Sequence, residues 1–145
     1  MPPFFAGSNS LYSVEFYQLI EQRLSAGGYA AQWFPIHLLT PSQAKAVAAA
    51  FVKVFPNSVL WFDPQSTDSM GTPQQGILIG NKGNDDWRKW PGFARQPERP
   101  RSLTEATVDA GLMLSPSALA AYVEGVIPVT DDNQSLSFGT DGLHR

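Results

Sequence analysis

The stretch LYSVEFYQLIEQRLSAGGYAAQWFP, at residues 11–35, constrains the fold most, because a helix, a stop and a strand follow one another directly. Apolar side chains recur every four residues, which predicts an amphipathic helix over residues 14–25 with Ser13 as its N-cap. A Gly-Gly pair ends that helix. Residues 29–34 are almost wholly apolar, which predicts a strand covered by helices on both faces. Helices that feed strands in this way usually follow an earlier strand, so we expect the sheet to extend beyond this one.

Gly, Pro and capping residues also mark the boundaries of the other predicted helices and strands. In chain order, we expect a helix from Thr40 to the break at Pro56, strands at 58–62 and 76–80, and helices at 103–110 and 115–124. The strands at 29–34 and 58–62 are joined through a helix, which implies a right-handed parallel-type crossover. The strands at 58–62 and 76–80 are joined by a loop alone, which implies an antiparallel hairpin. Residues 82–101 show no period and are expected to be irregular, and residues 129–139 read as a polar turn followed by an edge strand.

Composition narrows the class of protein. The chain has 145 residues, 43% of them hydrophobic and 16% charged, which suits one compact soluble domain. Its net charge of -3 gives no electrostatic basis for binding nucleic acid or an anionic membrane, and we expect neither partner. There is no cysteine, hence no disulfide and no thiolate metal site. No basic leader and no apolar run of about 18 residues is present, so we expect a cytoplasmic location.

Residues 2–56, PPFFAGSNSLYSVEFYQLIEQRLSAGGYAAQWFPIHLLTPSQAKAVAAAFVKVFP, resemble the second half of a spermidine synthase-like protein. The motifs that carry the resemblance are the LYSVEFY helix start, the GG stop, the QW strand end and the VFP helix end. VTDDNQSLSF, at residues 129–138, is similar to the tail of larger bacterial members. The resemblance covers residues 2–83 and 129–138. It rests on the order and spacing of motifs that are individually weak.

The resemblance implies an α/β fold like that of class I methyltransferases, whose seven-stranded sheet ends in an antiparallel hairpin. We therefore expect a truncated Rossmann-like sheet at residues 1–83, and an irregular region with short helices at residues 84–145. In the family fold, the strand at 29–34 pairs on one side with a strand that this chain lacks. Its other side pairs with the closing strand at 76–80. The family's glycine-rich donor loop, its ribose-binding acid and its general-base aspartate would all lie upstream of Pro2.

The resemblance also implies where an acceptor amine would bind. A glutamine stands near the amine at the position of Gln32, and its amide could accept a hydrogen bond from an ammonium group. Asp63 and Asp68, in the loop at 63–75, could face the same amine. The family has a tyrosine-proline loop here, and this chain departs from it. We predict no catalytic residue, no metal site and no bound cofactor in the chain alone.

Other chemistry-bearing residues have simpler interpretations. His37 and His144 are too far apart in sequence for metal-ligand spacing, and His37 is expected to serve a loop or a helix entry. Tyr12 and Glu15 suit packing and the positive end of the first helix. Asp131 and Asp132 could form a paired-carboxylate site, but a solvated turn explains them better. The WRKWPGFARQPERPR stretch at residues 87–101 mixes aromatic and basic residues, yet the overall acidity disfavours nucleic acid.

Three functions stay open. The first is a half of an aminopropyltransferase that is inactive alone. The second is a non-enzymatic interaction module or a subunit of a split enzyme, and the third is a small enzyme of unrelated chemistry. A missing neighbour would leave the strand at 29–34 with an open edge, so we expect a homo-oligomer or a missing N-terminal half as partner. Residues 129–138 are the expected intramolecular cover of that edge.

Overall fold

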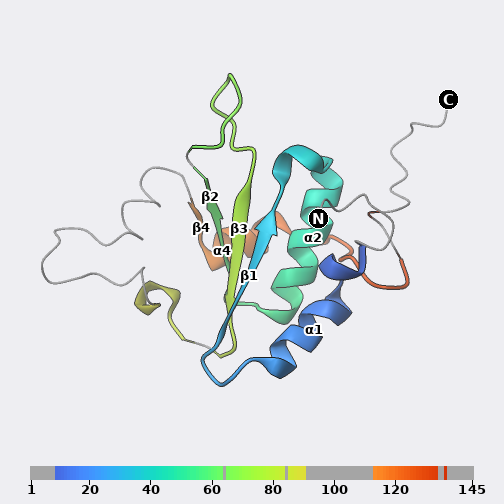
Figure 1. Cartoon of the computed structure of the whole chain (residues 1–145), viewed down its shortest axis with the longest axis vertical. Helices are drawn as coiled ribbons and strands as arrows, with labels where there is room; N and C mark the ends of the chain where they lie inside the picture. The colour runs from blue at the N-terminus through green and yellow to red at the C-terminus, as the bar shows by residue number, and fades with distance from the viewer. Residues whose placement is uncertain (1–8, 64, 84, 91–112, 134–135, 137–145) are drawn as a thin grey trace, which may run out of the picture.

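The computed structural model describes residues 9–63, 65–83, 85–90, 113–133 and 136 of the chain. Figure 1 shows one open sheet of four strands with helices packed beside it. The elements in chain order are η1 (Asn9–Tyr12), α1 (Val14–Arg23), β1 (Tyr29–Phe34), η2 (Ile36–Leu38), α2 (Pro41–Val54), β2 (Val59–Phe62), β3 (Gly76–Asn81), η3 (Trp87–Lys89), β4 (Met113–Leu114) and α4 (Pro116–Tyr122). No helix in these ranges has both the length and the apolar character needed to cross a membrane.

The strand order is β1-β3-β2-β4, and every neighbouring pair is antiparallel. The pairing of β1 with β3 confirms the expected contact between residues 29–34 and 76–80, with Tyr29 opposite Asn81 and Phe34 opposite Gly76. The hairpin of β2 and β3 is also confirmed. The expected parallel-type crossover between residues 29–34 and 58–62 is confirmed in strand direction. Since β1 and β2 are both antiparallel to β3, they run in the same direction and are joined through α2, and β3 lies between them.

Local sequence explains where the helices begin. The Ser13 side chain accepts a hydrogen bond from the Phe16 backbone N–H at 3.2 Å, which confirms it as the N-cap of α1. Thr40 and Gln43 form a capping box at the start of α2, and Pro41 takes the first helical position. Both starts follow from side chains that satisfy free first-turn N–H groups.

The C-terminus of α1 is fixed by a residue far along the chain. The helix ends at Arg23, two residues earlier than expected, and Gly27 makes the following turn with φ 72°. The Lys82 ammonium donates to the carbonyl oxygens of Glu21 and Leu24 at 2.8 and 3.1 Å. A cation at this end satisfies free carbonyls and suits the helix dipole. Lys82 thereby ties α1 to the end of β3.

The expectation that β1 is buried on both faces is wrong. Ala30 and Phe34 are buried, whereas Tyr29, Ala31 and Trp33 are exposed. The alternation arises because helices cover only one face of β1, and successive side chains in a strand point to opposite faces. We call the face that carries Ala30 and Phe34 the inner face, and the face that carries Tyr29 and Trp33 the outer face.

The main core lies between the inner face and the helices. It joins side chains of α1, α2, α4, β1, β2 and β3, among them Tyr17, Phe51, Leu60, Leu78 and Leu119. The predicted α1 stripe of Phe16, Ile20 and Leu24 is only partly buried and packs against this core. Val14 and Tyr17 are the fully buried side chains of the helix.

A smaller cluster lies on the outer face, where Val59, Trp87, Trp90 and Met113 are buried together. The strand β4 and the short helices η1, η2 and η3 are elements that the sequence did not predict. Each has only two to four residues, too few to display a hydrophobic period. The helix expected at 103–110, and residues 91–101 of the segment expected to be irregular at 82–101, lie outside the described residues.

The C-terminal segment does not cover β1 where it is described. The Val129 carbonyl accepts from the Val14 N–H at 2.9 Å, and the Asn9 side chain donates to the Thr130 carbonyl and accepts from the Leu136 N–H. These bonds attach Val129, Thr130 and Leu136 to η1 and the beginning of α1. The expected cover for the β1 edge is therefore wrong for the described part of this segment. The edge strand expected after the turn lies largely outside the described residues.

The two faces of β1 predict unequal mutational costs. Phe34→Ala removes a side chain that is 2% exposed, and should lower the free energy of unfolding by about 3–5 kcal/mol. Trp33→Ala removes a side chain that is 39% exposed, and should cost about 1–2 kcal/mol. Urea unfolding of both variants measures the difference. Equal losses would show that the inner and outer faces have been assigned wrongly.

Candidate functional site

The carboxyl ends of β1 and β2 lie at the same end of the sheet, because the two strands run in the same direction. In open α/β sheets this is the end at which ligands bind. The long connection between β2 and β3 projects from it (Figure 1). Polar side chains from β1, β2 and this connection gather here, which makes it the candidate site.

Three side chains form a hydrogen-bonded chain across this end. Trp33 Nε1 donates to Gln75 Oε1 at 3.0 Å, and Gln75 Nε2 donates to Asp63 Oδ2 at 3.4 Å. The other Asp63 oxygen accepts from the Gln65 backbone N–H at 2.9 Å. The backbone N–H of Asp63 also donates to the Gln75 carbonyl at 3.1 Å. The network holds the Asp63 carboxylate in a fixed direction at the base of the hairpin.

Gln32 is placed apart from Asp63. In the strand register Gln32 lies opposite Leu78 on the inner face, whereas Trp33 lies opposite Ile77 on the outer face. Gln32 Nε2 donates to the Trp33 carbonyl at 3.1 Å. Its Oε1 has no hydrogen-bond partner among the described residues. The two predicted site residues Gln32 and Asp63 thus share one end of the sheet, but their positions belong to opposite faces.

Asp68 lies at the tip of the hairpin, away from both. Its Oδ1 accepts hydrogen bonds from the backbone N–H groups of Met70 and Thr72, both at 2.9 Å. The bonds from Thr72 and then Met70 lower the pKa of the Asp68 carboxyl below its usual value. The observed geometry is that of an Asx turn, in which the side chain organises its own loop. Gly71, with φ 79°, completes the turn.

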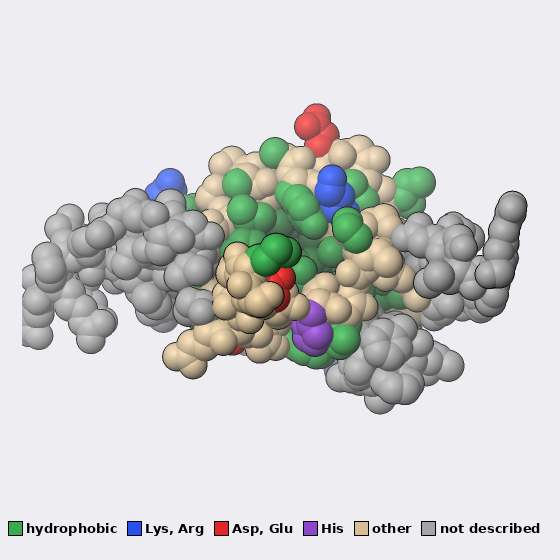
Figure 2. Space-filling view, turned by 90° about the horizontal axis from the view of Figure 1, so that it is seen from above, with side chains coloured by type: hydrophobic (Ala, Val, Ile, Leu, Met, Phe, Trp, Pro, Cys, Tyr) green, Lys and Arg blue, Asp and Glu red, His purple; other side chains and the backbone are tan. Residues whose placement is uncertain are grey.

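His37 links η2 to the hairpin. The backbone N–H and the ring Nδ1 of His37 both lie within hydrogen-bond distance of the Gln74 carbonyl, at 2.9 and 2.8 Å. A carbonyl can only accept, so Nδ1 carries the proton. Figure 2 views this end of the molecule from above. Within the described ranges, no group of three potential metal ligands occurs.

Sequence reasoning missed Trp33, Gln75 and His37 as parts of this end. Period-2 alternation of residues 29–34 would have placed Trp33 and Gln32 on different faces. Nothing in the sequence pairs Gln75 with Trp33, because that contact depends on the register of β1 with β3.

Other candidates serve the fold or the surface. Glu15 Oε2 accepts from the Asp131 backbone N–H at 3.0 Å, so Glu15 holds the C-terminal turn as well as the start of α1. Asp131 and Asp132 are exposed in that turn. Burial raises the pKa of Tyr12, which is nearly inaccessible in the core.

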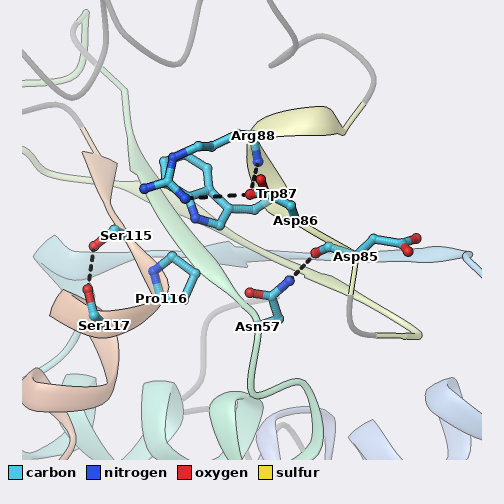
Figure 3. Close-up of a pocket in the computed structure, with 8 residues that line it drawn as sticks. All are labelled: Asn57, Asp85, Asp86, Trp87, Arg88, Ser115, Pro116 and Ser117. Atoms are coloured by element: carbon cyan, nitrogen blue, oxygen red, sulfur yellow. Dashed lines mark hydrogen bonds and ion pairs between the residues drawn. The ribbon is translucent and has the colours of Figure 1, made fainter.

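A hollow with a volume of about 340 Å³ lies elsewhere, between the segment at 85–88, Asn57 and the start of α4. Figure 3 shows Arg88 over the Trp87 ring, at 4.6 Å from its centre, and paired with Asp86 at 3.5 Å. Asn57 donates to the Asp85 carbonyl. Trp87 and Trp90, from the aromatic and basic stretch, are buried in the smaller core. They therefore do not form an exposed stacking surface.

Comparison of the chain with protein-family models, with curated proteins and with solved structures found no match.

The hairpin tip gives a pH-dependent prediction. Because the folded pKa of Asp68 is depressed, its bonds to Met70 and Thr72 persist at neutral pH and are lost as the pH falls through that lowered value, below about 3.8. Proton NMR should show these two amide resonances moving only in that acidic range. Asp68→Ala should accelerate amide exchange at Met70 and Thr72 at neutral pH, whereas Asp132→Ala should not. Unchanged exchange in Asp68→Ala would contradict this account of the turn.

Proposed function

We propose that this chain forms the acceptor-side half of a spermidine synthase-like aminopropyltransferase fold, and that it does not catalyse transfer alone. One observation carries the proposal, namely the strand order β1-β3-β2. The closing strand β3 is inserted between two strands that share a direction and are joined through α2. The family resemblance implies this arrangement for the end of a methyltransferase-like sheet.

The position of α1 supports the same proposal. In Figure 1, α1 lies on the side of β1 away from β3, where it packs against α2. A strand, a helix and a parallel strand connect in a right-handed sense in nearly all proteins. A helix in the place of α1 therefore suits a preceding strand that runs parallel to β1 along its free edge.

The polar residues at the carboxyl ends of β1 and β2 suit an amine. The Asp63 carboxylate is fixed by Gln75 and Gln65, and its oxygens keep lone pairs for an ammonium group. Gln32 Oε1, on the opposite face of the same end, could also accept from an ammonium group. Each of the two groups would bind a protonated amine on its own face. Aminopropyl transfer also needs a base to deprotonate that amine and a cradle that holds the donor carbon in line.

The chain's own motifs offer no such cradle. The sequence has no G-x-G-x-x-G and no P-loop. The glycine-bearing stretch after β3 leads into the three-residue helix η3, which is too short to present the N–H groups of a phosphate-binding helix. We therefore assign acceptor binding to this chain and donor binding to a partner.

Donor binding is tested by calorimetric titration of the purified chain with S-adenosylmethionine and with its decarboxylated form. We expect no one-to-one site tighter than roughly 100 μM, since that affinity corresponds to about 5.5 kcal/mol and needs a formed pocket. A saturable site at or below that concentration would contradict the division into donor and acceptor halves.

Acceptor binding is tested by NMR titration with putrescine and spermidine at constant ionic strength. We expect weak binding, near about 1 mM, with shifts concentrated in residues 32–37 and 63–75. Gln32→Leu and Asp63→Asn should each weaken it several-fold. Asp131→Asn is the matched control, because Asp131 is exposed in a distant turn. Shifts of similar size around Asp131, or shifts reproduced by sodium chloride, would refute an amine site.

The second candidate, a non-enzymatic interaction module, is favoured by one observation. β1 is an edge strand, and no described strand pairs with its other side. An unpaired edge is a ready template for another strand.

A further inference from the structure

The free edge of β1 exposes a defined set of backbone groups. Lys82 N–H donates to the Gly28 carbonyl at 2.8 Å, so position 28 points toward β3. Backbone groups alternate along a strand, and those of residues 30, 32 and 34 therefore point toward β3 as well. The N–H and C=O groups of Tyr29, Ala31 and Trp33 point to the free edge. Among the described residues, these groups make one hydrogen bond, which the Trp33 carbonyl accepts from Gln32 Nε2.

This edge lacks the usual protection against association. Native edge strands are commonly blunted by lysine, proline or inward charges, and β1, YAAQWF, contains none of them. Tyr29 and Trp33 are 41% and 39% exposed on its outer face. Figure 1 shows α1 on the side of β1 away from β3, and the α1 stripe of Phe16, Ile20 and Leu24 is only partly buried. Beside the edge, the outer face of β1 is thus apolar.

We propose that β1 of a second copy of this chain occupies the edge, paired antiparallel about a two-fold axis that passes beside Ala31. In this register Ala31 lies opposite Ala31 of the partner subunit, and Tyr29 lies opposite Trp33 of the partner subunit. These are hydrogen-bonded positions, because the same residues direct their backbone groups to the edge. The two four-stranded sheets then form one continuous sheet.

The register makes the strand complementary to itself. Tyr29 and Trp33 belong to the same face, so each aromatic ring gains an aromatic ring directly across the new strand pair. On the inner face, Gln32 lies opposite Ala30 of the partner subunit, which is small enough to leave room for the amide. A two-fold axis beside residue 29 or residue 33 would pair only part of the strand. The axis at Ala31 pairs residues 29–33 of both copies and sets Tyr29 opposite Trp33 of the partner subunit.

The dimer is expected to be weak. Four aromatic side chains of about 200 Å² each, about 40% exposed before association, offer on the order of 300 Å² to the contact. Interfaces below about 1,200 Å² in total belong to the weak and transient class, and α1 adds area on one face alone. Sedimentation should therefore show a monomer in dilute solution and a dimer as the concentration rises toward millimolar. This inference uses the β1 register alone and does not rest on the proposed amine site. It concerns the chain by itself, because a strand of a donor half would compete with the second copy for the same edge of β1.

The absence of cysteine makes a direct test possible, because any introduced cysteine is unique. Ala31→Cys would place two thiols across the axis, where Cα atoms about 5.5 Å apart are within the range that a disulfide spans. Mild oxidation should yield a disulfide-linked dimer many-fold faster than it does for Ser42→Cys, an exposed control position at the start of α2. Equal rates for the two variants would overturn the proposal.

Ala31→Pro supplies the complementary test. It removes an N–H that faces the edge, so it should abolish concentration-dependent association and leave the circular dichroism spectrum unchanged. Ala31→Val keeps the N–H and should keep the dimer. If Ala31→Pro fails to fold, the cysteine variants still decide. A wild-type monomer at all concentrations, a dimer that survives a folded Ala31→Pro, or a purified chain that carries another protein on this edge would each overturn the proposal.

Discussion

The antiparallel pairing of β3 with both β1 and β2 is the interaction on which the rest of the structure depends. This pairing requires residues without side chains where β3 passes close to α2 and β2. A Cβ added to Gly80 would lie 2.5 Å from Phe55 Cβ and 3.0 Å from the Phe51 ring. A Cβ added to Gly76 would lie 2.5 Å from the Trp61 carbonyl oxygen. The two glycines therefore allow β3 to fit beneath the aromatic pair of α2 and beside β2, which closes the core from the inner face.

This central position of β3 also determines what lies at the two ends of the sheet. At one end, Gln75 enters β3 between Trp33 and Asp63, so the register of three strands fixes the polar network of the candidate site. At the other end, Lys82 leaves β3 and holds the C-terminus of α1. The same register decides which backbone groups of β1 face outward. The proposed amine site and the proposed dimer edge are thus two consequences of one pairing.

The parts of the fold that the sequence predicted are those set by local chemistry. Ser13 and Thr40 locate the starts of α1 and α2, and the bounds of β1 agree with the structure because Gly28 and Pro35 flank the strand. The burial of β1 was mispredicted, because an apolar run does not reveal whether one face or two are covered. The two residues of β4 form a strand only because they pair with β2, so no local sequence pattern predicts this strand.

In the candidate site too, individual residues were predicted from the sequence and their spatial arrangement was not. Gln32 and Asp63 were predicted as individual residues, and both are found at the carboxyl ends of same-direction strands. Their assignment to opposite faces follows from pairing between strands, which the sequence does not encode locally. Asp68 was grouped with them because it is close to Asp63 along the chain. Its hydrogen bonds within the tip, to Met70 and Thr72, could be recognised only once the turn was seen.

Amide hydrogen exchange along β1 in dilute solution tests the central claim most directly, because it reads the register and the free edge residue by residue. The structure predicts slow exchange at Ala30, Gln32 and Phe34, whose N–H groups face β3, and fast exchange at Tyr29, Ala31 and Trp33, whose N–H groups face solvent. Uniform protection along the strand would show that another segment covers the edge, and the opposite alternation would show that β1 and β3 are paired one residue out of the described register.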